Sequence, residues 1–461
     1  MINHSRVRKI HFAGIGGAGM SGIAEVLNNM GFEISGSDIK DSQIVERLRR
    51  SGIKIYIGHR KENVDGAETL VYSSAITRDN VEVKTASEMK IPVIPRAEML
   101  AELMRVKFAI AVAGTHGKTS TTSMIASILN EAKKDPTYVV GGKLKTEESG
   151  AKLGKSEFLV AEADESDGSF LKLFPTIAVI TNIEDDHLDH YGNFESLKVA
   201  FTDFGNKVPF FGSVAVNMDC PNSKEILSGI NKKVITFGTS KNADIRAENI
   251  VPGTFGSTFN LIIKGINKGG VTLNVGGHHN VLNSLAAIAA ALESGINIDD
   301  VKSGLLKFSL PDRRFQVLYR SDRVLVVDDY AHHPTEIKVT LDTLNHGGFR
   351  RIITIFQPHR FTRLESLMDE FSKSFDGSDI VVLAKLYSAN QKEIEGVSSC
   401  VLADLMRKNS TGEILYIDEN EDVLTYLQSE AKEGDAIVFL SAGDLTKTAH
   451  SFAKIMEIEK K

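Results

Sequence analysis

The chain has 461 residues, 42% of them hydrophobic and 25% charged, which is ordinary for a globular protein of about two to four domains. Its formal net charge of −6 argues against a general nucleic-acid surface, so anionic ligands need local cations and helix N-termini. Two cysteines, Cys220 and Cys400, argue against a disulfide framework and favour a reducing cytoplasm. We expect no signal peptide before Gly14 and, because no stretch of about 18 apolar residues occurs, no membrane span.

The N-terminal third alternates short apolar runs with helical patterns, which predicts a mostly parallel, doubly wound α/β sheet. A helix is expected at residues 21–30 and a charged helix at 96–105. The predicted strands are residues 10–15, 33–37, 54–57, 69–72 and 92–94.

A glycine turn, GIGGAG at residues 14–19, joins the first strand to the first helix and matches G-x-G-x-x-G. Glycines allow a diphosphate to approach the backbone at a helix N-terminus. Asp38 ends the second strand, where its carboxylate could accept a hydrogen bond from a ribose hydroxyl. The turn therefore predicts a nucleotide of unspecified kind, and a tight turn with packing glycines only is the alternative. The glycines concerned are Gly14, Gly16, Gly17 and Gly19.

A second α/β segment follows, with strands predicted at residues 108–113, 138–140, 158–161 and 177–181. Between about residues 245 and 275 the pattern changes to short β runs rich in Gly, Thr and Asn, which indicates hairpins on one flank of the sheet. Helices predicted at 280–293 and 299–307 close the segment.

The first strand of this segment leads into a second phosphate-type loop and a helix at residues 121–129. Its backbone N–H groups can surround the β- and γ-phosphates of ATP, with Lys118 as a mobile charge and the Thr119 hydroxyl placed for Mg²⁺. A strict G-x-x-x-x-G-K-[ST] motif requires glycine where this chain has Val112, so the match is a variant. ATP binding is predicted for Gly114, Thr115, His116, Gly117, Lys118, Thr119 and Ser120.

Two acidic segments follow the next strands, EADESD at 162–167 and TNIEDDHLD at 181–189. Ligands gather at the carboxyl ends of parallel strands, so Lys118, Glu162 and His187 are expected to meet. Carboxylates suit Mg²⁺ with a phosphate partner, and Glu162 and His187 are predicted metal ligands beside Thr119. Asp164 and Glu165, taken alone, fit a solvated loop better.

A third segment begins near residue 311, with strands predicted at residues 324–328, 352–356, 380–383 and 436–440. Arg360 and Arg363 are three residues apart, so they would share a helix face if a helix starts there, and would then suit a carboxylate or phosphate. Zinc is not expected at His332 and His333, because no other ligands stand at zinc spacing.

Two polar features lie near the boundary of the second and third segments. Asn280 either caps the helix that it opens or touches a base or phosphate. Arg313 and Arg314 lie at a predicted hinge, where a guanidinium could reach a γ-phosphate, and a simple surface pair is the alternative.

Together these motifs resemble the Mur ligases of peptidoglycan synthesis. The resemblance implies an α/β chain of three domains. These are an N-terminal Rossmann-like domain for the UDP substrate (1–105), a central P-loop-type mononucleotide-binding sheet with a flanking β-hairpin region for ATP (106–310), and a C-terminal Rossmann-like domain for the amino acid (311–461). It rests on HFAGIGGAGMSGIAEVL, GSD, SSAI, AGTHGKTSTTSM, EADESDGSF, TNIEDDHLDHYGNF, GGHHNVLNSLAAIA, RRF, DDYAHHPTE and FQPHRFTR.

The resemblance implies an ATP-dependent, amide-bond-forming ligase with Mg²⁺, or Mn²⁺, as its metal. It would join L-alanine to the carboxylate of UDP-N-acetylmuramate through an acyl phosphate. The enzyme would be a bacterial cytoplasmic monomer or homodimer that serves cell-wall biogenesis, cell shape and cell division.

The resemblance also implies roles for individual residues. The catalytic group would be Lys118, Glu162, His187 and Arg314. Besides the phosphate loop, the nucleotide would be contacted by Asn280, Asn283, Arg314 and Asp329. The UDP substrate would be bound by the glycine turn, Asp38, His59, Ser73 and Ser74. The acceptor side would be formed by Tyr330, His332, Arg360 and Arg363.

The chain departs from the family pattern twice. Residues 441–445 read SAGDL where the family resembles GAGDI, and the carbamylated lysine of sibling ligases has no clear counterpart, since Lys198 stands at a different offset. The base that accepts the amine proton stays unassigned, because a metal ligand such as His187 cannot easily do both. The alternative functions are a ligase that adds a preformed tripeptide in cell-wall recycling, an NAD-dependent oxidoreductase and a nucleotide-gated binding protein.

Overall fold

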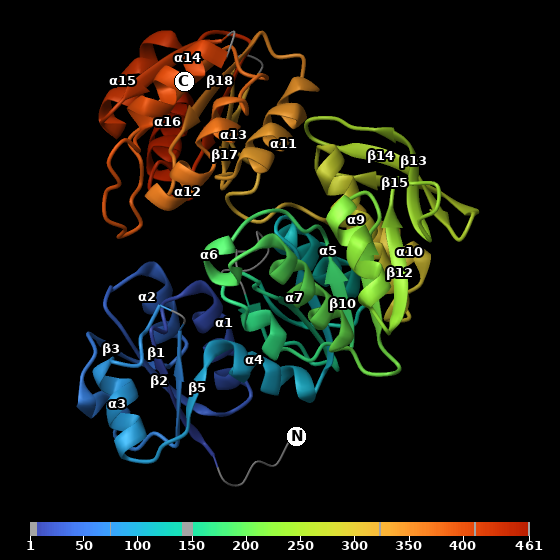
Figure 1. Ribbon diagram of the computed structural model, residues 1–461, viewed down its shortest axis with the longest axis vertical. Helices are drawn as coiled ribbons and strands as arrows, with labels where there is room; N and C mark the ends of the chain where they lie inside the picture. The colour runs from blue at the N-terminus through green and yellow to red at the C-terminus, as the bar shows by residue number, and fades with distance from the viewer. Residues whose placement is uncertain (1–6, 74, 141–150, 322–323, 410–411, 460–461) are drawn as a thin grey trace. The chain divides into compact units, whose positions relative to one another are not determined.

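The computed structural model (Figure 1) describes residues 7–73, 75–140, 151–321, 324–409 and 412–459. The chain forms two compact units, each treated separately below. One lies within residues 1–249, 259–273 and 280–308, and the other within 250–258, 274–279 and 309–461. No helix in the described ranges is both long and apolar enough to cross a bilayer.

The first sheet is parallel throughout and has the strand order β3-β2-β1-β4-β5. The chain passes from β1 outward to β3 and then returns to β4 on the other side of β1. Such a reversal opens a crevice at the carboxyl ends of the two adjacent strands, where ligands bind in open α/β sheets. The elements are β1 (Lys9–Ala13), α1 (Ala18–Asn29), β2 (Glu33–Asp38), α2 (Gln43–Arg50), β3 (Lys54–Ile57), η1 (Lys61–Val64), β4 (Thr69–Tyr72), α3 (Val81–Glu88), β5 (Val93–Pro95) and α4 (Arg96–Arg105).

The second sheet has the order β15-β14-β13-β12-β11-β10-β6-β9-β7-β8. Its β6 (Phe108–Ala113) is an apolar strand, buried at five of six positions, and lies between β10 (Ile177–Ile180) and β9 (Phe158–Glu162), parallel to both. Strands buried on both faces are typical of doubly wound sheets. The remaining strands are β7 (Thr137–Val139), β8 (Ala151–Lys152), β11 (Ser213–Asn217), β12 (Lys233–Gly238), β13 (Ile245–Val251), β14 (Ser257–Ile263) and β15 (Ile266–Leu273).

Helices connect the strands of this second sheet and pack against it. Two of them make the most extensive helix pair of the sheet, α5 (Lys118–Glu131) with α10 (Ile298–Lys307). The others are η2 (Ser169–Lys172), α6 (Leu188–Tyr191), α7 (Phe194–Asn206), α8 (Pro221–Glu225), η3 (Ile226–Gly229) and α9 (His278–Glu293).

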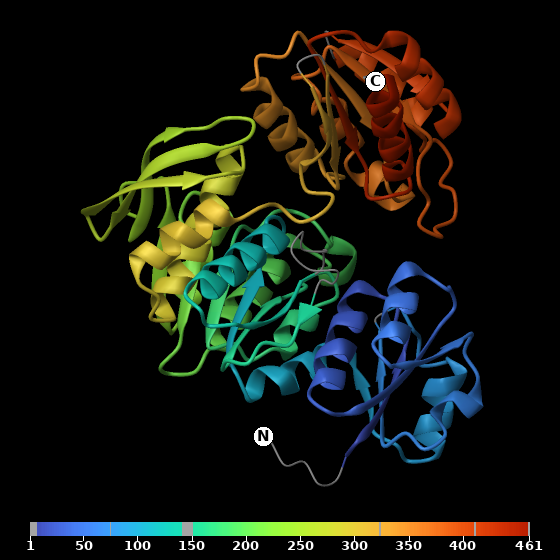
Figure 2. The same cartoon turned by 180° about the vertical axis from the view of Figure 1, so that it is seen from behind.

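The third sheet has the order β16-β17-β21-β18-β19-β20, with β16 antiparallel and the other strands parallel. Val324 and Val326 pack into one apolar cluster, whereas Leu325 and Val327 pack into another, so both faces are covered. The helices on the two faces can be followed in Figures 1 and 2. The strands are β16 (Gln316–Arg320), β17 (Val324–Asp329), β18 (Arg351–Phe356), β19 (Ile380–Ala384), β20 (Glu413–Ile417) and β21 (Asp435–Leu440). The helices are α11 (Pro334–Asn345), α12 (Phe361–Ser366), α13 (Met368–Ser372), α14 (Ser399–Asn409), α15 (Asn420–Glu430) and α16 (Thr446–Glu459).

These three α/β sheets confirm the predicted fold class. The predictions had no strand at β11, β12, β16 or β20, because apolar runs of five or six residues cannot be assigned by periodicity alone. Helices α1 and α5 both begin three residues earlier than predicted, at Ala18 and Lys118. The glycine turn and the phosphate loop therefore run directly into the first helical turn, where N–H groups have no intrahelical partner.

Gly36 offers a test of how tightly the first sheet is packed. A Cβ atom there would lie 2.6 Å from Ile15 Cδ1 and 2.9 Å from the carbonyl oxygen of Phe12. Gly36→Ala should destabilise the first domain by about 1–3 kcal/mol through overpacking. Gly270→Ala is the control, because a Cβ on Gly270 meets nothing within 4 Å. Calorimetric unfolding of the full chain should show a lowered transition for the first variant only, and equal transitions would contradict the packing.

Candidate functional site

The phosphate loop after β6 has a backbone that only glycine accommodates. Gly114 and Gly117 have φ values of 136° and 82°, in the left-handed region. A Cβ on Gly114 would collide with the Thr181 hydroxyl, and one on Gly117 with the side-chain oxygen of Asn283. Neighbouring segments thus pack directly against the loop, and a side chain at either glycine would displace the loop backbone.

Lys118, the first residue of α5, turns back over the loop. Its ammonium donates to the carbonyl oxygens of Gly114 and Thr115, at 2.6 and 3.1 Å. It also donates to Glu165 Oε1 at 2.7 Å, and the Glu165 side chain is only 2% exposed. The prediction that Glu165 belongs to a solvated loop is wrong, because this carboxylate is buried and neutralises the lysine.

Burial controls the protonation of this pair. Burial raises the pKa of Glu165 to about 7, against the opposing charge of Lys118. Burial would lower the pKa of Lys118, but the charge and hydrogen bond of Glu165 together with the charges of Asp164 and Glu162 outweigh burial and raise that pKa above its ordinary value. Tyr191 fixes the segment by donating its hydroxyl to the Glu165 carbonyl oxygen at 2.5 Å. The lysine is thus held charged and close to the loop backbone.

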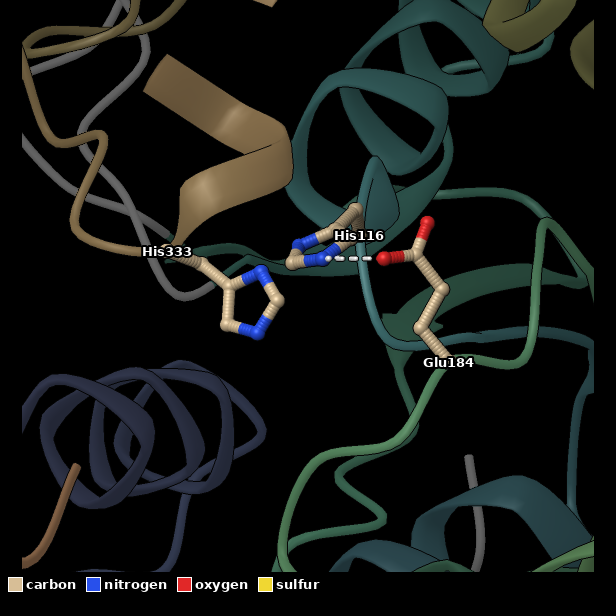
Figure 3. Close-up of side chains that lie close together, drawn as sticks. All are labelled: His116, Glu184 and His333. Carbon is tan, nitrogen blue, oxygen red and sulfur yellow. Dashed lines mark ion pairs between the residues drawn. The ribbon is translucent and has the colours of Figure 1, made fainter. Parts of the chain in front are cut away.

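The segment after β10 supports the loop from the other side. The backbone N–H of His116 donates to Asn182 Oδ1 at 2.8 Å, and the Thr181 hydroxyl donates to the carbonyl oxygen of His116 at 2.6 Å. The backbone N–H of Glu184 donates to the Thr115 hydroxyl at 2.9 Å. Figure 3 shows the His116 ring and the Glu184 carboxylate turned toward each other, with His116 Nε2 3.5 Å from Glu184 Oε2.

The structure brings the predicted metal ligands to one edge of the second sheet. Glu162 is the last residue of β9, and His187 follows β10 with a left-handed backbone (φ 60°) as the N-cap of α6. His187 Nε2 lies 4.0 Å from Glu165 Oε1 and 3.5 Å from Asp186 Oδ2. The buried Oε2 of Glu165 has no hydrogen-bond partner among the described residues. A buried carboxylate oxygen without a partner, at the sheet edge that also carries Glu162 and His187, fits a hard divalent cation.

Asn283 reaches this loop from α9, as its collision with a Cβ on Gly117 shows. Asn280 is buried in the first turn of the same helix, and its Oδ1 accepts from Asn283 Nδ2 at 3.3 Å. Because α9 begins at His278, the prediction that Asn280 opens and caps the helix is wrong.

The glycine turn of the first sheet is held by the end of β2. The N–H groups of Gly14 and Ile15 donate to the Ser37 carbonyl oxygen at 2.8 and 3.0 Å. Asp38 accepts from the Gly16 N–H at 2.9 Å, so part of its carboxylate stabilises the turn itself. A Cβ on Gly14 would lie 2.9 Å from Ser73 Oγ. These contacts bring the ends of β1, β2 and β4 together, whereas Ser74 lies outside the described residues.

In the third sheet, Asp329 ends β17 and is buried. Its carboxylate accepts from the N–H groups of Phe315 and Ala331, at 2.7 and 2.8 Å. Burial raises the pKa of Asp329 to about 6, although Arg314 opposes this. Arg314 lies over the Tyr330 ring, 5.3 Å from its centroid, and 3.7 Å from Glu336 Oε1. Arg314 is therefore no simple surface residue, because it packs on an aromatic ring beside two carboxylates.

The ends of β17 and β18 meet in an aromatic and cationic cluster. The His332 ring lies 5.1 Å from Tyr330 and 6.0 Å from His359, between ring centroids. Burial lowers the pKa of His332 to about 4, so the imidazole is neutral at physiological pH. The predicted shared helix face of Arg360 and Arg363 required a helix that starts at Arg360, and this condition is not met. Arg360 precedes α12 with a left-handed backbone (φ 70°), and only Arg363 lies on the helix.

Sequence reasoning overlooked several supporting residues. Glu165 and Asn182 hold the loop, and Arg96 pairs with Asp164, Nη2 to Oδ2, at 3.6 Å. A Cβ on Gly19 would lie 2.8 Å from Arg96 Nη1, so this arginine contacts the glycine turn as well. The acidic run itself was the signal for Glu165, but nothing in the local sequence marks which of its carboxylates is buried.

A strand–loop–helix phosphate site with its lysine folded over the loop, in a chain of three α/β sheets, is typical of enzymes that bind a nucleoside triphosphate. Three family descriptions match the chain: the Mur ligase family catalytic domain over residues 9–108, the Mur ligase middle domain over 112–291, and the Mur ligase glutamate ligase domain over 313–443. The chain belongs to the Mur ligase family, and like its members it is an ATP-dependent ligase that forms an amide bond.

Relatives extend over the whole chain. UDP-N-acetylmuramate–L-alanine ligase of Geotalea daltonii is 47% identical over 451 residues, 98% of each protein. The protein of the same name from Trichlorobacter lovleyi is 48% identical over 453 residues, 98% of this chain and 99% of the relative. The crystal structure of UDP-N-acetylmuramate-alanine ligase from Thermotoga maritima superposes with a TM-score of 0.83 at 28% identity, covering 98% of this chain and 99% of that one.

Gly117 provides a test of the phosphate loop. Gly117→Ala should raise the Kd for ATP about tenfold or more, because the methyl group collides with Asn283 and strains a left-handed backbone. Gly265→Ala is a matched control, since Gly265 has φ 81° but a Cβ atom there would meet nothing within 4 Å. Calorimetric titration with ATP measures both variants. Equal affinities would show that the loop geometry does not serve the nucleotide.

Proposed function

We propose that this protein joins L-alanine to the carboxylate of UDP-N-acetylmuramate, with ATP as the source of energy, in peptidoglycan precursor synthesis. The observation that carries the proposal is the phosphate loop with Lys118 folded over it, in a chain whose full-length relatives have this named activity. The enzyme would work in the bacterial cytoplasm as a monomer or homodimer.

The chemistry explains why such a loop is needed. A carboxylate is a poor electrophile, because its charge repels an attacking amine and oxide is a poor leaving group. Transfer of the γ-phosphoryl group of ATP to the muramoyl carboxylate gives an acyl phosphate, from which the alanine amine displaces phosphate to form the amide. The protein mainly positions the groups and stabilises charge on the transferring phosphoryl oxygens. Lys118 is the residue proposed to supply that charge.

The proposed metal ligands are Thr119, Glu162 and His187, and the buried Glu165 carboxylate is an additional candidate. Mg²⁺, or Mn²⁺, would neutralise phosphate charge at this edge of the sheet. Lys198, which stands at a different offset from the lysine that sibling ligases carbamylate, pairs with Glu195 and Glu225 at 2.6 and 2.8 Å. We therefore propose no carbamate bridge.

The UDP substrate would bind in the crevice of the first sheet. The helix N-terminus after the glycine turn suits its diphosphate, and Asp38 retains acceptor capacity for a ribose hydroxyl. His59 and Ser73 follow β3 and β4 at the same edge and would contact the uridine. The proposed set is Gly14, Gly16, Gly17, Gly19, Asp38, His59, Ser73 and Ser74.

The remaining proposed roles concern the nucleotide and the acceptor. Asn280 and Asn283 would bind the nucleotide from α9, and Arg314 and Asp329 are also proposed nucleotide-binding residues. The neutral His332 and the Tyr330 ring would line the acceptor side, with Arg360 and Arg363 as carboxylate-binding cations. The proposed domain limits stay 1–105 for UDP, 106–310 for ATP and 311–461 for the amino acid.

One alternative ligase differs only in its incoming substrate. The crystal structure of a murein peptide ligase from Psychrobacter arcticus has a TM-score of 0.69 and 24% identity, a likeness of fold. The relatives at 47–48% identity are named for L-alanine instead. Their names favour L-alanine over a preformed tripeptide.

Phosphate release tests the substrate assignment. The protein is mixed with UDP-N-acetylmuramate, Mg²⁺, ATP and single amino acids or the tripeptide, and L-alanine should give the highest rate. Glycine and L-serine should follow within about 10- to 200-fold, because a methyl-sized pocket discriminates by only about 1–3 kcal/mol. A rate with L-alanine no higher than with buffer would refute the proposal. A higher rate with the tripeptide would favour the recycling ligase.

Lys118→Ala should lower kcat about 100-fold or more, because a charge aimed at the transferring phosphoryl group is lost. Lys307→Ala is the control, since Lys307 also pairs with a glutamate, Glu131, at 2.7 Å, but at the other end of α5. Its kcat should be unchanged. Steady-state phosphate release compares the two, and near-wild-type turnover of the first variant would remove Lys118 from the mechanism.

A further inference from the structure

A fully buried carboxylate joins several strand ends of the first sheet. Glu82 lies in the first turn of α3, and its side chain is 0% exposed. Its Oε2 accepts from the Ser37 hydroxyl at 2.6 Å and lies 2.9 Å from His59 Nδ1. Its Oε1 accepts from Asn63 Nδ2 at 2.6 Å. A buried charge is costly unless hydrogen bonds satisfy it, so this complete set of partners calls for an explanation.

The carboxylate is ionised. Burial alone would raise the pKa of Glu82, but the hydrogen bonds from Ser37, Asn63 and His59 and the nearby His11 ring, whose Nε2 lies 3.7 Å from Oε2, outweigh burial and lower the pKa to about 2. Its place in the first turn of a helix favours the negative charge further. An ionised carboxylate can only accept hydrogen bonds. The proton between Glu82 and His59 must therefore sit on Nδ1 of the histidine.

With Nδ1 protonated, the other ring nitrogen, Nε2, decides what His59 can offer a ligand. In a neutral imidazole with Nδ1 protonated, Nε2 carries a lone pair and accepts hydrogen bonds. Within the described part of the chain Nε2 of His59 makes no hydrogen bond, and the side chain is 14% exposed. His59 follows β3, at the carboxyl edge where Asp38 and the glycine turn also lie.

The same carboxylate is connected to the glycine turn. Ser37 donates its hydroxyl to Glu82, while its carbonyl oxygen accepts from the N–H groups of Gly14 and Ile15. The Ser37 hydroxyl also lies 3.0 Å from His59 Nδ1. One buried group thus fixes both the turn proposed for the diphosphate and the histidine proposed for the nucleoside.

We propose that Glu82 is a positioning residue of the uridine-nucleotide site, which holds His59 with Nδ1 protonated so that Nε2 accepts a hydrogen bond from the uridine. The inference rests on the proposed function, which gives His59 to the UDP substrate. Uridine offers two kinds of matching donor, the N3–H of the base and the ribose hydroxyls. If Nε2 accepts from the base N3–H, cytosine would not bind in the same way, because its N3 is an acceptor.

The tautomer is tested without any substrate. In the full chain labelled with ¹⁵N-histidine at about pH 8.5, where an imidazole holds one proton, long-range ¹H–¹⁵N spectra distinguish protonated Nδ1 from protonated Nε2. The His59 signals are those that disappear in His59→Asn. Protonated Nδ1 in the wild type and a shift toward protonated Nε2 in Glu82→Gln are expected. Protonated Nε2 in the wild type would overturn the proposal.

The binding test uses calorimetric titration with UDP. Glu82→Gln should raise the Kd for UDP about 10- to 100-fold and leave the Kd for ATP unchanged. Glu25→Gln is the matched control, because Glu25 is also a buried glutamate of the first sheet's helices, paired with Arg47 at 2.9 Å. It should bind UDP as the wild type does. Unchanged UDP affinity in Glu82→Gln would overturn the proposal.

A second pair of variants covers the case that Glu82→Gln fails to fold. His59→Gln keeps an acceptor oxygen on a side chain of similar reach, whereas His59→Ala removes it. The first should bind UDP more tightly than the second, and equal affinities would count against an acceptor role. Titrations with 3-methyl-UDP and with 2′-deoxy-UDP identify the donor. The analogue that lacks the donor to His59 should bind the wild type more weakly than UDP does. In His59→Ala this analogue and UDP should bind with equal affinity.

Failure of this inference differs from failure of the proposed function. If wild type binds no UDP and makes no product from UDP-N-acetylmuramate, the proposed function fails. If wild type binds UDP and ligates L-alanine, but Glu82→Gln and the His59 variants bind UDP equally well, only the role of Glu82 fails.

Discussion

The central site depends on β6 lying between β9 and β10, all three parallel. Loops at the carboxyl ends of adjacent parallel strands have to converge, which brings the lysine loop, the first acidic run and the second acidic run together. The Lys118–Glu165 ion pair, Nζ to Oε1, then closes this edge. Removing one partner would leave the other charge buried and uncompensated, which is strongly destabilising. The pair also keeps the lysine charged beside the loop.

The three sheets share an α/β architecture, but each surrounds its buried ionisable side chains differently. In the second sheet, charge is paired beside a loop of left-handed glycines. In the first sheet, Glu82 gathers hydroxyl, amide and imidazole donors, and stays ionised at a pKa of about 2. In the third, burial keeps His332 neutral and raises the pKa of Asp329 to about 6. The ionisation of a buried group thus follows from the balance between burial and the donors and charges that reach it.

The side chains at each sheet suit a different step or substrate of the proposed ligation. A charged lysine suits phosphoryl transfer, because negative charge is spread over the transferring oxygens. An acceptor such as Nε2 of His59 suits a nucleoside donor. A neutral histidine beside Tyr330 and the arginines suits an amino acid whose amine has to lose a proton before attack. The base for that proton stays unassigned, since His332 and His187 each have other contacts.

The sequence by itself determined the α/β class, the glycine turn, the phosphate loop and its lysine, because these follow from local periodicity and from short motifs at strand ends. It did not determine which carboxylate pairs with Lys118, that Asn283 touches Gly117, or that Arg360 stands before its helix. Burial and long-range contacts decide these, and Glu165 lies 47 residues from its lysine. Glu82 shows best what the sequence cannot predict. In the sequence it is an ordinary glutamate of a charged helix, and only the packing of the sheet buries it and brings its hydrogen-bond partners to it.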